Sequence, residues 1–331
     1  MNEFVPLASL RNRHLMTVAA VFWPRKFPGL PLGAPRFFTV EPGTQIRGDC
    51  HWQKNPREHP TLVLIHGLEG ASDSNYMLGV AEKAFQAGFN AVRLNQRNCG
   101  GTETLTPTLY HSGLSGDIRS VVLELIERDG LPEVFAAGYS MGGNLVLKMA
   151  GELQESAPAE LRGVVAVAPA LDLAACADAL AEPRNFIYER HFVRSLRKHM
   201  RHKASLFPEI YQVDGAMAAL RKVATVREFD EVITARFCGF RGAADYYDRS
   251  SARRVVATIR KPTLILTSQD DPFVPFPPFE DPAISGNPNI TLVATKHGGH
   301  CAYISSNPGP ARFWAEERIV EFCSNNSKRR N

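Results

Sequence analysis

The amino-acid sequence of 331 residues predicts an α/β fold, with a mostly parallel sheet, helices on both of its faces and an inserted helical cap. Two observations lead to this prediction. Short apolar runs alternate with segments of helical periodicity, which is typical of βαβ units in a parallel sheet. Residues 172–259 interrupt this alternation, because they contain helical patterns but no run that resembles a buried strand.

Several apolar runs are predicted to be buried strands, because parallel strands covered on both faces are apolar throughout. They are Thr61–Ile65, Phe89–Asn95, Glu133–Gly138, Arg162–Ala168, Pro262–Thr267 and Asn289–Ala294. Two earlier runs, Arg36–Val40 and Gln45–Trp52, flank the turn signal Pro42-Gly43. Since proline and glycine together favour a turn, we expect these two runs to form an antiparallel hairpin at the edge of the sheet.

The segments between the strands have the apolar spacing of amphipathic helices. They include Asn75–Ala87, Gly116–Asp129 and Gly142–Leu153. We therefore predict a core domain made of residues 1–171 and 260–331. Residues 172–259, punctuated by Pro183 and Pro208, are predicted to form a helical cap inserted between two strands of that core.

Bulk composition excludes several classes of protein. Hydrophobic residues make up 44% of the chain and charged residues 22%, as in ordinary globular proteins. A net charge of +4 is too small at this length to indicate a nucleic-acid partner. The six cysteines form no Cys-x-x-Cys pair and no metal-ligand spacing, so we expect reduced thiols and no metal site.

The N-terminal region contains the short apolar run Leu15–Trp23 after Arg11 and Arg13. The run is followed by Pro24-Arg25-Lys26 instead of a small-residue cleavage site, which disfavours a signal peptide. No run in the chain reaches the length that a membrane-spanning helix requires. We therefore expect a cytoplasmic protein.

The strongest chemical signal is Gly138-Tyr139-Ser140-Met141-Gly142, which lies between a predicted strand and a predicted helix. In a nucleophile elbow, the glycines leave room for a sharp turn that lifts the serine hydroxyl above the sheet. The alternative is a tightly packed glycine-rich turn without chemistry. The strand–turn–helix context favours Ser140 as a nucleophile.

A serine nucleophile needs a base that takes its proton, and a carboxylate that orients the base. Two adjacent aspartates follow the predicted strand Pro262–Thr267 directly. Asp271 is the preferred acid because Pro272 favours an extended backbone at the preceding residue. Asp270 is the alternative.

The base is predicted to be His300, in the sequence Lys296-His297-Gly298-Gly299-His300. This sequence follows the last predicted strand, and its two glycines allow a loop that presents the imidazole to Ser140. His297 is the alternative. The chain order serine, acid, histidine matches the order that this nucleophile turn usually has.

Backbone amides that bind an oxyanion are the third requirement of acyl transfer. The predicted strand Thr61–Ile65 runs into His66-Gly67-Leu68-Glu69-Gly70. We predict that the N–H groups of Leu68 and Met141 form the oxyanion hole, and that His66 and Gly67 shape the loop. The alternative is an ordinary glycine-rich turn.

Taken together, these motifs resemble those of the alpha/beta-hydrolase superfamily. The closest likeness is to the branch called AB hydrolase family 4, which groups bacterial hydrolases with mammalian alpha/beta-hydrolase domain-containing esterases. The shared motifs extend over nearly the whole chain. They are Leu10–Thr17, His66–Gly70 with Ser72-Asp73-Ser74, Asn95–Gly101, Gly138–Asn144, Asp270-Asp271-Pro272 and His300.

The resemblance implies the alpha/beta-hydrolase fold, a triad of Ser140, Asp271 and His300, and hydrolysis of carboxylic esters through an acyl-enzyme without a cofactor. Substrates in this family are commonly esters of short or medium acyl chains, or acylglycerols. Mammalian members carry a membrane-spanning N-terminus, and none is expected here. Thioesterase, amidase or acyltransferase activity on the same triad is an alternative, as is a non-catalytic binding protein on this fold.

The predicted cap contains a basic stretch from Arg184 to Lys203, with seven Lys or Arg residues and one acid, Glu189. Apolar residues such as Phe186 and Leu196 interleave with these charges. A basic amphipathic helix can rest weakly on an anionic membrane surface. The alternative is a helix with a solvated outer face over a packed inner face.

Overall fold

The computed structural model describes residues 3–213 and 215–328. Its centre is an eight-stranded sheet in the order β1-β2-β4-β3-β5-β6-β7-β8. β2 is antiparallel to both β1 and β4, and the other neighbouring strands are parallel. The bounds are β1 Ala34–Glu41, β2 Thr44–His51, β3 Thr61–Ile65, β4 Asn90–Leu94, β5 Val134–Tyr139, β6 Leu161–Val167, β7 Thr263–Ser268 and β8 Ile290–Thr295. The mostly parallel α/β sheet predicted from the sequence is confirmed.

The predicted strands differ from the observed ones by at most two residues at each end. β1 is longer than the run Arg36–Val40 that indicated it, whereas β2 has the length of the run Gln45–Trp52 and is shifted by one residue toward the turn. Gly43 lies in this turn with φ 74°, a conformation that glycine adopts without the steric cost of a Cβ atom.

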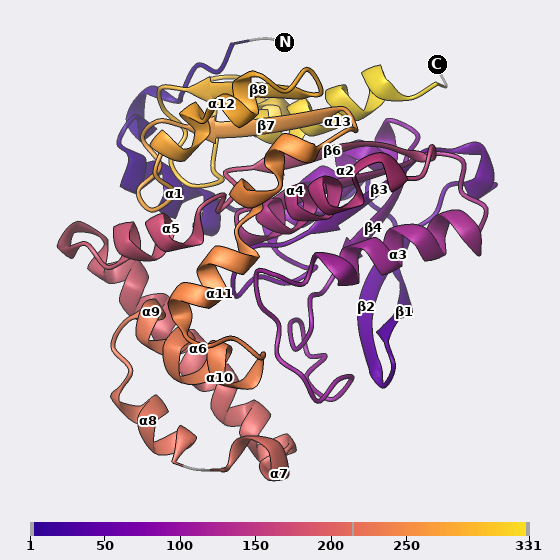
Figure 1. Ribbon diagram of the computed structural model, residues 1–331. Coiled ribbons are helices and arrows are strands. Elements are labelled where there is room, and N and C mark those ends of the chain that lie inside the picture. Colours follow the sequence, from indigo (N-terminus) through magenta and orange to yellow (C-terminus); the bar gives the residue numbers. More distant parts are fainter. Residues whose placement is uncertain (1–2, 214, 329–331) are drawn as a thin grey trace.

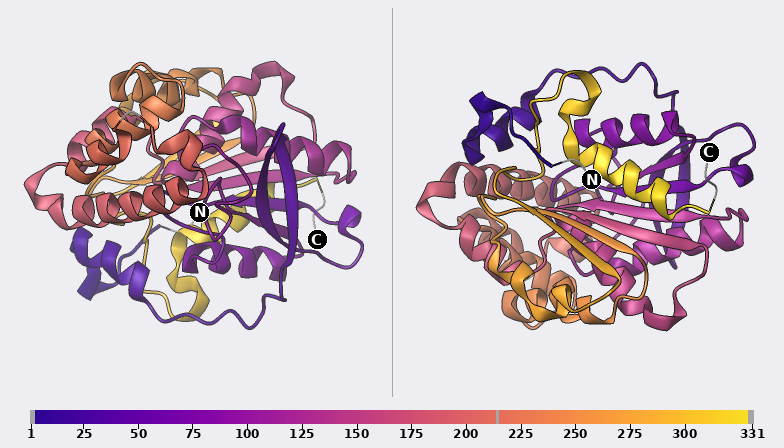
Figure 2. Two further views of the ribbon diagram at one scale, coloured as in Figure 1. Left: turned by 90° about the horizontal axis from the view of Figure 1, so that it is seen from below. Right: turned by 90° about the horizontal axis from the view of Figure 1, so that it is seen from above.

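Helices cover both faces of the sheet (Figure 2). α3 (Ser115–Glu127) and α4 (Met141–Leu153) pack on one face, and α2 (Asn75–Gln86) and α13 (Trp314–Asn326) pack on the other. Within β3, Val63 and Ile65 join the first apolar layer, whereas Leu62 and Leu64 join the second. Burial on both faces explains why this strand is apolar from Leu62 to Ile65.

The segment between β6 and β7 forms helices and no strand in the part that the structure describes. We call α5 to α11 the helical insertion. Figure 1 shows it beyond one end of the sheet. A π-helical turn, Asp230–Thr234, lies between α9 and α10. The bounds are α5 Leu173–Leu180, α6 Phe186–Leu206, α7 Pro208–Tyr211, α8 Ala216–Lys222, α9 Val226–Phe229, α10 Ala235–Phe237 and α11 Ala243–Ser250.

Two further helices lie outside the regular alternation, α1 (Arg13–Phe22) and α12 (Pro282–Ser285). α1 begins where the side chain of Asn12 accepts hydrogen bonds from the N–H groups of His14 and Leu15, at 3.0 and 3.2 Å. This N-cap satisfies donors that the first helical turn leaves free. Among the described residues, no helix combines the length and hydropathy needed to cross a membrane.

Candidate active site

Four loops meet at one edge of the sheet, because the parallel strands β3, β5, β7 and β8 all end there. In open α/β sheets, ligands bind beyond the carboxyl ends of the strands. The loops after these four strands carry Leu68, Ser140, Asp271 and His300 respectively. The topology therefore brings the four sequence-predicted regions to the same edge.

Ser140 lies at the turn between β5 and α4 with φ 54° and ψ −116°. A non-glycine residue in such a sparsely populated conformation costs about 1–3 kcal/mol. The turn is held on both sides, because the Ser140 N–H donates to the Val167 carbonyl at 2.9 Å and its carbonyl accepts from the Asn144 N–H at 3.0 Å. Strain that the surroundings enforce in this way is common at active sites.

The two glycines around Ser140 are required by close backbone packing. A Cβ atom at Gly138 would lie 2.1 Å from the carbonyl oxygen of Gly142. A Cβ atom at Gly142 would lie 2.4 Å from the carbonyl oxygen of Ile65. The elbow therefore presses directly against the end of β3, which carries the loop with Leu68.

Asp271 and His300 form a direct hydrogen bond, with 2.7 Å between Asp271 Oδ2 and His300 Nδ1. The Asp271 side chain is fully buried. Its other oxygen, Oδ1, accepts hydrogen bonds from the backbone N–H groups of Phe273 and Val274, at 3.0 and 2.9 Å. One carboxylate oxygen is thus fixed by the backbone and the other is free to orient the imidazole.

The alternative pair, Asp270 and His297, is arranged differently. Asp270 Oδ2 lies 3.3 Å from His297 Nδ1, and Asp270 Oδ1 accepts from the Gly299 N–H at 3.0 Å. The His297 side chain is 44% exposed, compared with 11% for His300. This pair braces the loop after β8 at its surface, so the geometry favours Asp271 and His300 as acid and base.

The electrostatics of His300 follow from its partner. Burial alone would lower the pKa of the imidazole, but the carboxylate of Asp271 outweighs burial and raises that pKa above 6.5. Ser140 Oγ makes no hydrogen bond within the described part of the chain, to His300 or to any other group. A contact between nucleophile and base often forms only in the substrate complex.

The N–H groups of Leu68 and Met141 are free to bind a ligand. Neither donates a hydrogen bond within residues 3–213 and 215–328. Met141 is the first residue of α4, so its N–H has no partner in the helix and carries the positive end of the helix dipole. Gly67 brings the Leu68 loop against the elbow, since a Cβ atom there would lie 3.1 Å from Ser140 Cβ.

His66 shapes this loop from within the core. Its Nδ1 lies 2.8 Å from the Gly67 carbonyl oxygen, and its Nε2 accepts from the Gln96 N–H at 3.1 Å. Complete burial lowers the pKa of His66 to about 4, so the ring is neutral at physiological pH. A neutral ring that donates from one nitrogen and accepts at the other fixes the loop that carries Leu68.

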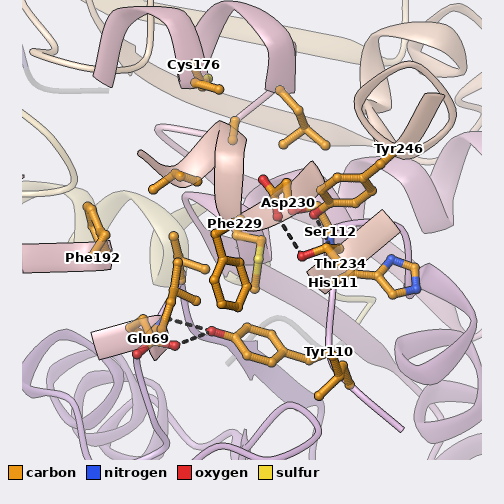
Figure 3. A pocket seen from close by; sticks show the side chains of 18 of the residues that line it. Glu69, Tyr110, His111, Ser112, Cys176, Phe192, Phe229, Asp230, Thr234 and Tyr246 are labelled. Atoms are coloured by element: carbon orange, nitrogen blue, oxygen red, sulfur yellow. Dashed lines mark hydrogen bonds between the residues drawn. The ribbon is translucent and has the colours of Figure 1, made fainter. Parts of the chain in front are cut away.

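Ser140 lines a cavity that lies between the core and the helical insertion. Figure 3 shows other residues that line it, among them Glu69, Phe192 and Phe229. Its volume is about 140 Å³.

Core residues such as Leu68, Met141 and Phe273 line the cavity on one side. Residues of the insertion line the other side, and polar groups such as Lys203 and Asp230 lie among them. The apolar ones are Leu173, Ala177, Leu180, Phe192, Leu196, Met200, Val226 and Phe229. The core and the insertion therefore both contribute surface that a bound group would contact.

The family of the chain follows from comparison with known proteins. Residues 60–306 match the family model described as alpha/beta hydrolase fold. The chain belongs to the alpha/beta-hydrolase family. Sequence relatives agree with this assignment. YheT of Escherichia coli (strain K12), a candidate esterase, is 32% identical over 97% of this chain and 93% of its own length.

Two other relatives of this hydrolase have names that describe lipid substrates. Mouse phospholipase ABHD3 is 30% identical over 74% of this chain and 58% of its own length. Monoacylglycerol lipase of Saccharomyces cerevisiae (strain ATCC 204508 / S288c) is 29% identical over 80% of this chain and 58% of its own length. Among solved structures, the Pyrococcus furiosus esterase Pf2001 is similar in fold, with a TM-score of 0.57 at 15% identity over 91% of this chain and 98% of that one.

One group near the hydrolase elbow could not be foreseen from the sequence. Glu69 follows Leu68 with φ 58°, and its buried carboxylate accepts from the Tyr110 hydroxyl at 2.6 Å. Figure 3 shows this contact. On the other side, Glu69 Oε2 lies 3.0 Å from Nδ1 of His199 in α6. These partners are distant in sequence and belong to no motif, so no local pattern signals them.

Proposed function

We propose that this hydrolase cleaves carboxylic esters, with Ser140 as nucleophile, His300 as general base and acid, and Asp271 as the carboxylate that orients the imidazole. The observation that carries the proposal is the meeting at one sheet edge of a strained serine, a buried Asp–His pair and two free backbone amides. Relatives named as esterase, phospholipase and monoacylglycerol lipase support the same reaction class.

The proposed reaction begins when Ser140 Oγ attacks the ester carbonyl and His300 takes the serine proton. The N–H groups of Leu68 and Met141 stabilise the negative charge that develops on the carbonyl oxygen. His300 then protonates the leaving alcohol, which leaves an acyl-enzyme on Ser140. Water, deprotonated by His300, releases the acid and restores the serine.

The acyl group is proposed to enter the cavity beneath the helical insertion, because apolar side chains dominate its lining. A cavity of roughly 150 Å³ accommodates benzene in another protein. A volume of about 140 Å³ therefore fits a group of similar size. We propose esters of short or medium acyl chains, including acylglycerols, as the substrate class.

All six cysteines are free, which supports a reducing, cytoplasmic location.

The test compares Ser140→Ala with the wild type on p-nitrophenyl butyrate. We expect the variant to lose several orders of magnitude in kcat, while its circular dichroism spectrum stays that of the wild type. A fluorophosphonate probe should label the wild type and not the variant. Full activity in Ser140→Ala, or labelling that survives the substitution, would refute the assignment of the nucleophile.

A further inference from the structure

α1 presents large apolar side chains to solvent. Leu15 is 57% exposed, Val18 43%, Val21 65% and Phe22 78%. Residues 15, 18 and 22 recur at helical spacing, so they share one face of the helix. The buried residue Met16 lies on the opposite face and anchors the helix to the core. Single exposed apolar residues are ordinary, but a row of them along one helix indicates an interaction surface.

The beginning of α6 extends this row. The ring of Tyr188 stacks on His14 of α1, with 5.8 Å between the ring centroids, and its hydroxyl lies 3.3 Å from His14 Nδ1. Next to Tyr188, Phe186 is 58% exposed and Ile187 is 68% exposed. Both views in Figure 2 show α1 beside this helix. We call the combined set the α1/α6 surface, made of Leu15, Val18, Val21, Phe22, Phe186 and Ile187.

Arginines flank the beginnings of both helices of this surface. Arg11, Arg184 and Arg190 are exposed, and Arg13 is half-buried. Arg190 follows Phe186 by four residues, so the two side chains lie on the same face of α6. Burial lowers the pKa of His14, and the charges of Arg13 and Arg184 lower it further, which indicates a positive local potential.

Two acids lie near these arginines. Glu182 is exposed at 41% of its side chain and pairs with Arg184. Glu189 is buried and accepts a hydrogen bond from the backbone N–H of Val226. Neither acid neutralises Arg11, Arg13 or Arg190, so the apolar row keeps a positive border.

The surface also borders the catalytic edge. Tyr188 packs against Phe273, with 5.3 Å between the ring centroids, and Phe273 packs against His300 at 4.1 Å. From α1, Thr17 Oγ1 accepts a hydrogen bond from the backbone N–H of His300 at 2.9 Å. α1 is therefore attached directly to the loop that carries the proposed base, and α6 is connected to it through Phe273.

We propose that the α1/α6 surface docks on an anionic lipid membrane and presents lipid esters to the cavity beneath the helical insertion. Phe22, Phe186 and Ile187 would enter the boundary of the acyl chains, while the flanking arginines contact lipid phosphates. The lipid-ester part of this inference rests on the proposed function. Membrane docking itself does not depend on it.

The buried face of α6 restricts the membrane contact that the sequence predicts for the basic stretch 184–203. Beyond its first two turns, α6 buries Val193, Leu196, Met200 and Lys203 against the rest of the molecule. The outer face of this part of α6 carries exposed charged side chains such as Arg194 and Arg201, so only the beginning of the helix adds exposed large apolar side chains beside those of α1. A second copy of the chain could also cover an apolar face, but the positive border favours an anionic partner.

The test is sedimentation of the full chain with vesicles of phosphatidylcholine, either pure or mixed with phosphatidylglycerol. We expect binding to the mixed vesicles and little binding to the neutral ones. The double variant Phe22→Ser and Ile187→Ser should weaken binding roughly tenfold or more, because it removes two large apolar groups from the membrane. Leu32→Ser is the matched control, since Leu32 is 100% exposed and lies outside both helices.

Three results would overturn the inference: no sedimentation of the wild type with anionic vesicles, equal sedimentation of the double variant, or a wild-type dimer that the double variant converts to monomer. Hydrolysis of p-nitrophenyl acetate separates this inference from the proposed function. The double variant should keep the wild-type kcat/KM on this small ester and lose hydrolysis of an ester embedded in anionic vesicles. A wild type that binds vesicles but hydrolyses neither ester would overturn the proposed function alone.

Discussion

The carboxylate of Glu69 lies 3.0 Å from the imidazole Nδ1 of His199, and this contact joins the loop after β3 to helix α6 of the insertion. Glu69 is the residue after Leu68, whose N–H is proposed to bind the oxyanion. The same carboxylate holds Tyr110 from the core side at 2.6 Å. The position of the Leu68 amide therefore depends on a contact between the two halves of the cavity.

Glu69→Gln should weaken this tether while it keeps the size of a side chain that lines the cavity. Because the Leu68 amide then samples more positions, we expect kcat and kcat/KM to fall together, by roughly tenfold, with little change in KM. Steady-state kinetics on p-nitrophenyl butyrate measures this. His199→Gln should reproduce part of the loss, and the double variant should lose less than the sum of both free-energy changes. Strictly additive losses would contradict a shared tether.

The hydrogen bond between Asp271 and His300 predicts a pH dependence. Asp271 raises the pKa of His300 above 6.5, so the base is protonated to a higher pH than a free histidine. Activity should therefore rise with pH above 6.5. Asp271→Asn removes the negative charge, and we expect the His300 titration to move to lower pH and kcat to fall by about 10⁴-fold. NMR titration of the imidazole protons and the acid limb of kcat/KM report the shift. If His300 titrates in Asp271→Asn as it does in the wild type, Asp271 is not the carboxylate that orients His300.

Asp270→Asn provides the contrasting case. Asp270 contacts His297 and the Gly299 N–H, and an asparagine oxygen can still accept from that N–H. We expect kcat to change by less than about tenfold and the titration of His300 to stay that of the wild type. A large loss of activity with a shifted His300 titration would instead make Asp270 the acid of the triad.

Local patterns in the sequence were enough to predict the sheet and the elbow, for identifiable physical reasons. Strands buried on both faces are almost entirely apolar, as β3 is from Leu62 to Ile65. The glycines at positions 138 and 142 are required because an added Cβ atom would lie 2.1 or 2.4 Å from a backbone oxygen. Such constraints act within a few residues of the chain. The apolar runs and the paired glycines that they require can therefore be recognised in the sequence alone.

Long-range contacts could not be predicted, because they join residues with no shared local pattern. Thr17 of α1 holds the backbone of His300, and His199 of α6 meets Glu69, although more than one hundred residues separate the members of each pair. The sequence of the run Leu15–Trp23 disfavours a signal peptide but does not indicate where the run lies in the fold. Its place beside α6 depends on the tertiary fold, which fixes how the helix is oriented and which side chains stay exposed.

Gly142→Ala tests whether the elbow is as tightly packed as its geometry indicates. A Cβ atom at this position would lie 2.4 Å from the Ile65 carbonyl oxygen and 2.5 Å from that of His66, and both contacts are with backbone. The added Cβ atom fits only if the end of β3 or the elbow moves. We therefore expect the free energy of unfolding to fall by about 1–3 kcal/mol. Because the same movement shifts the Leu68 loop, kcat should fall as well.

Gly116→Ala is the matched control for this substitution. Gly116 lies in the first turn of α3 and is exposed. A Cβ atom added at this position would have no neighbouring atom within 4 Å. Alanine should therefore stabilise the protein by up to about 1 kcal/mol, since glycine is the poorer helix former. Urea unfolding followed by circular dichroism compares the two variants. If Gly142→Ala unfolds at the wild-type midpoint and keeps full activity, the contact between the elbow and β3 is looser than these distances indicate, and the proposed link from the glycine to the Leu68 amide is wrong.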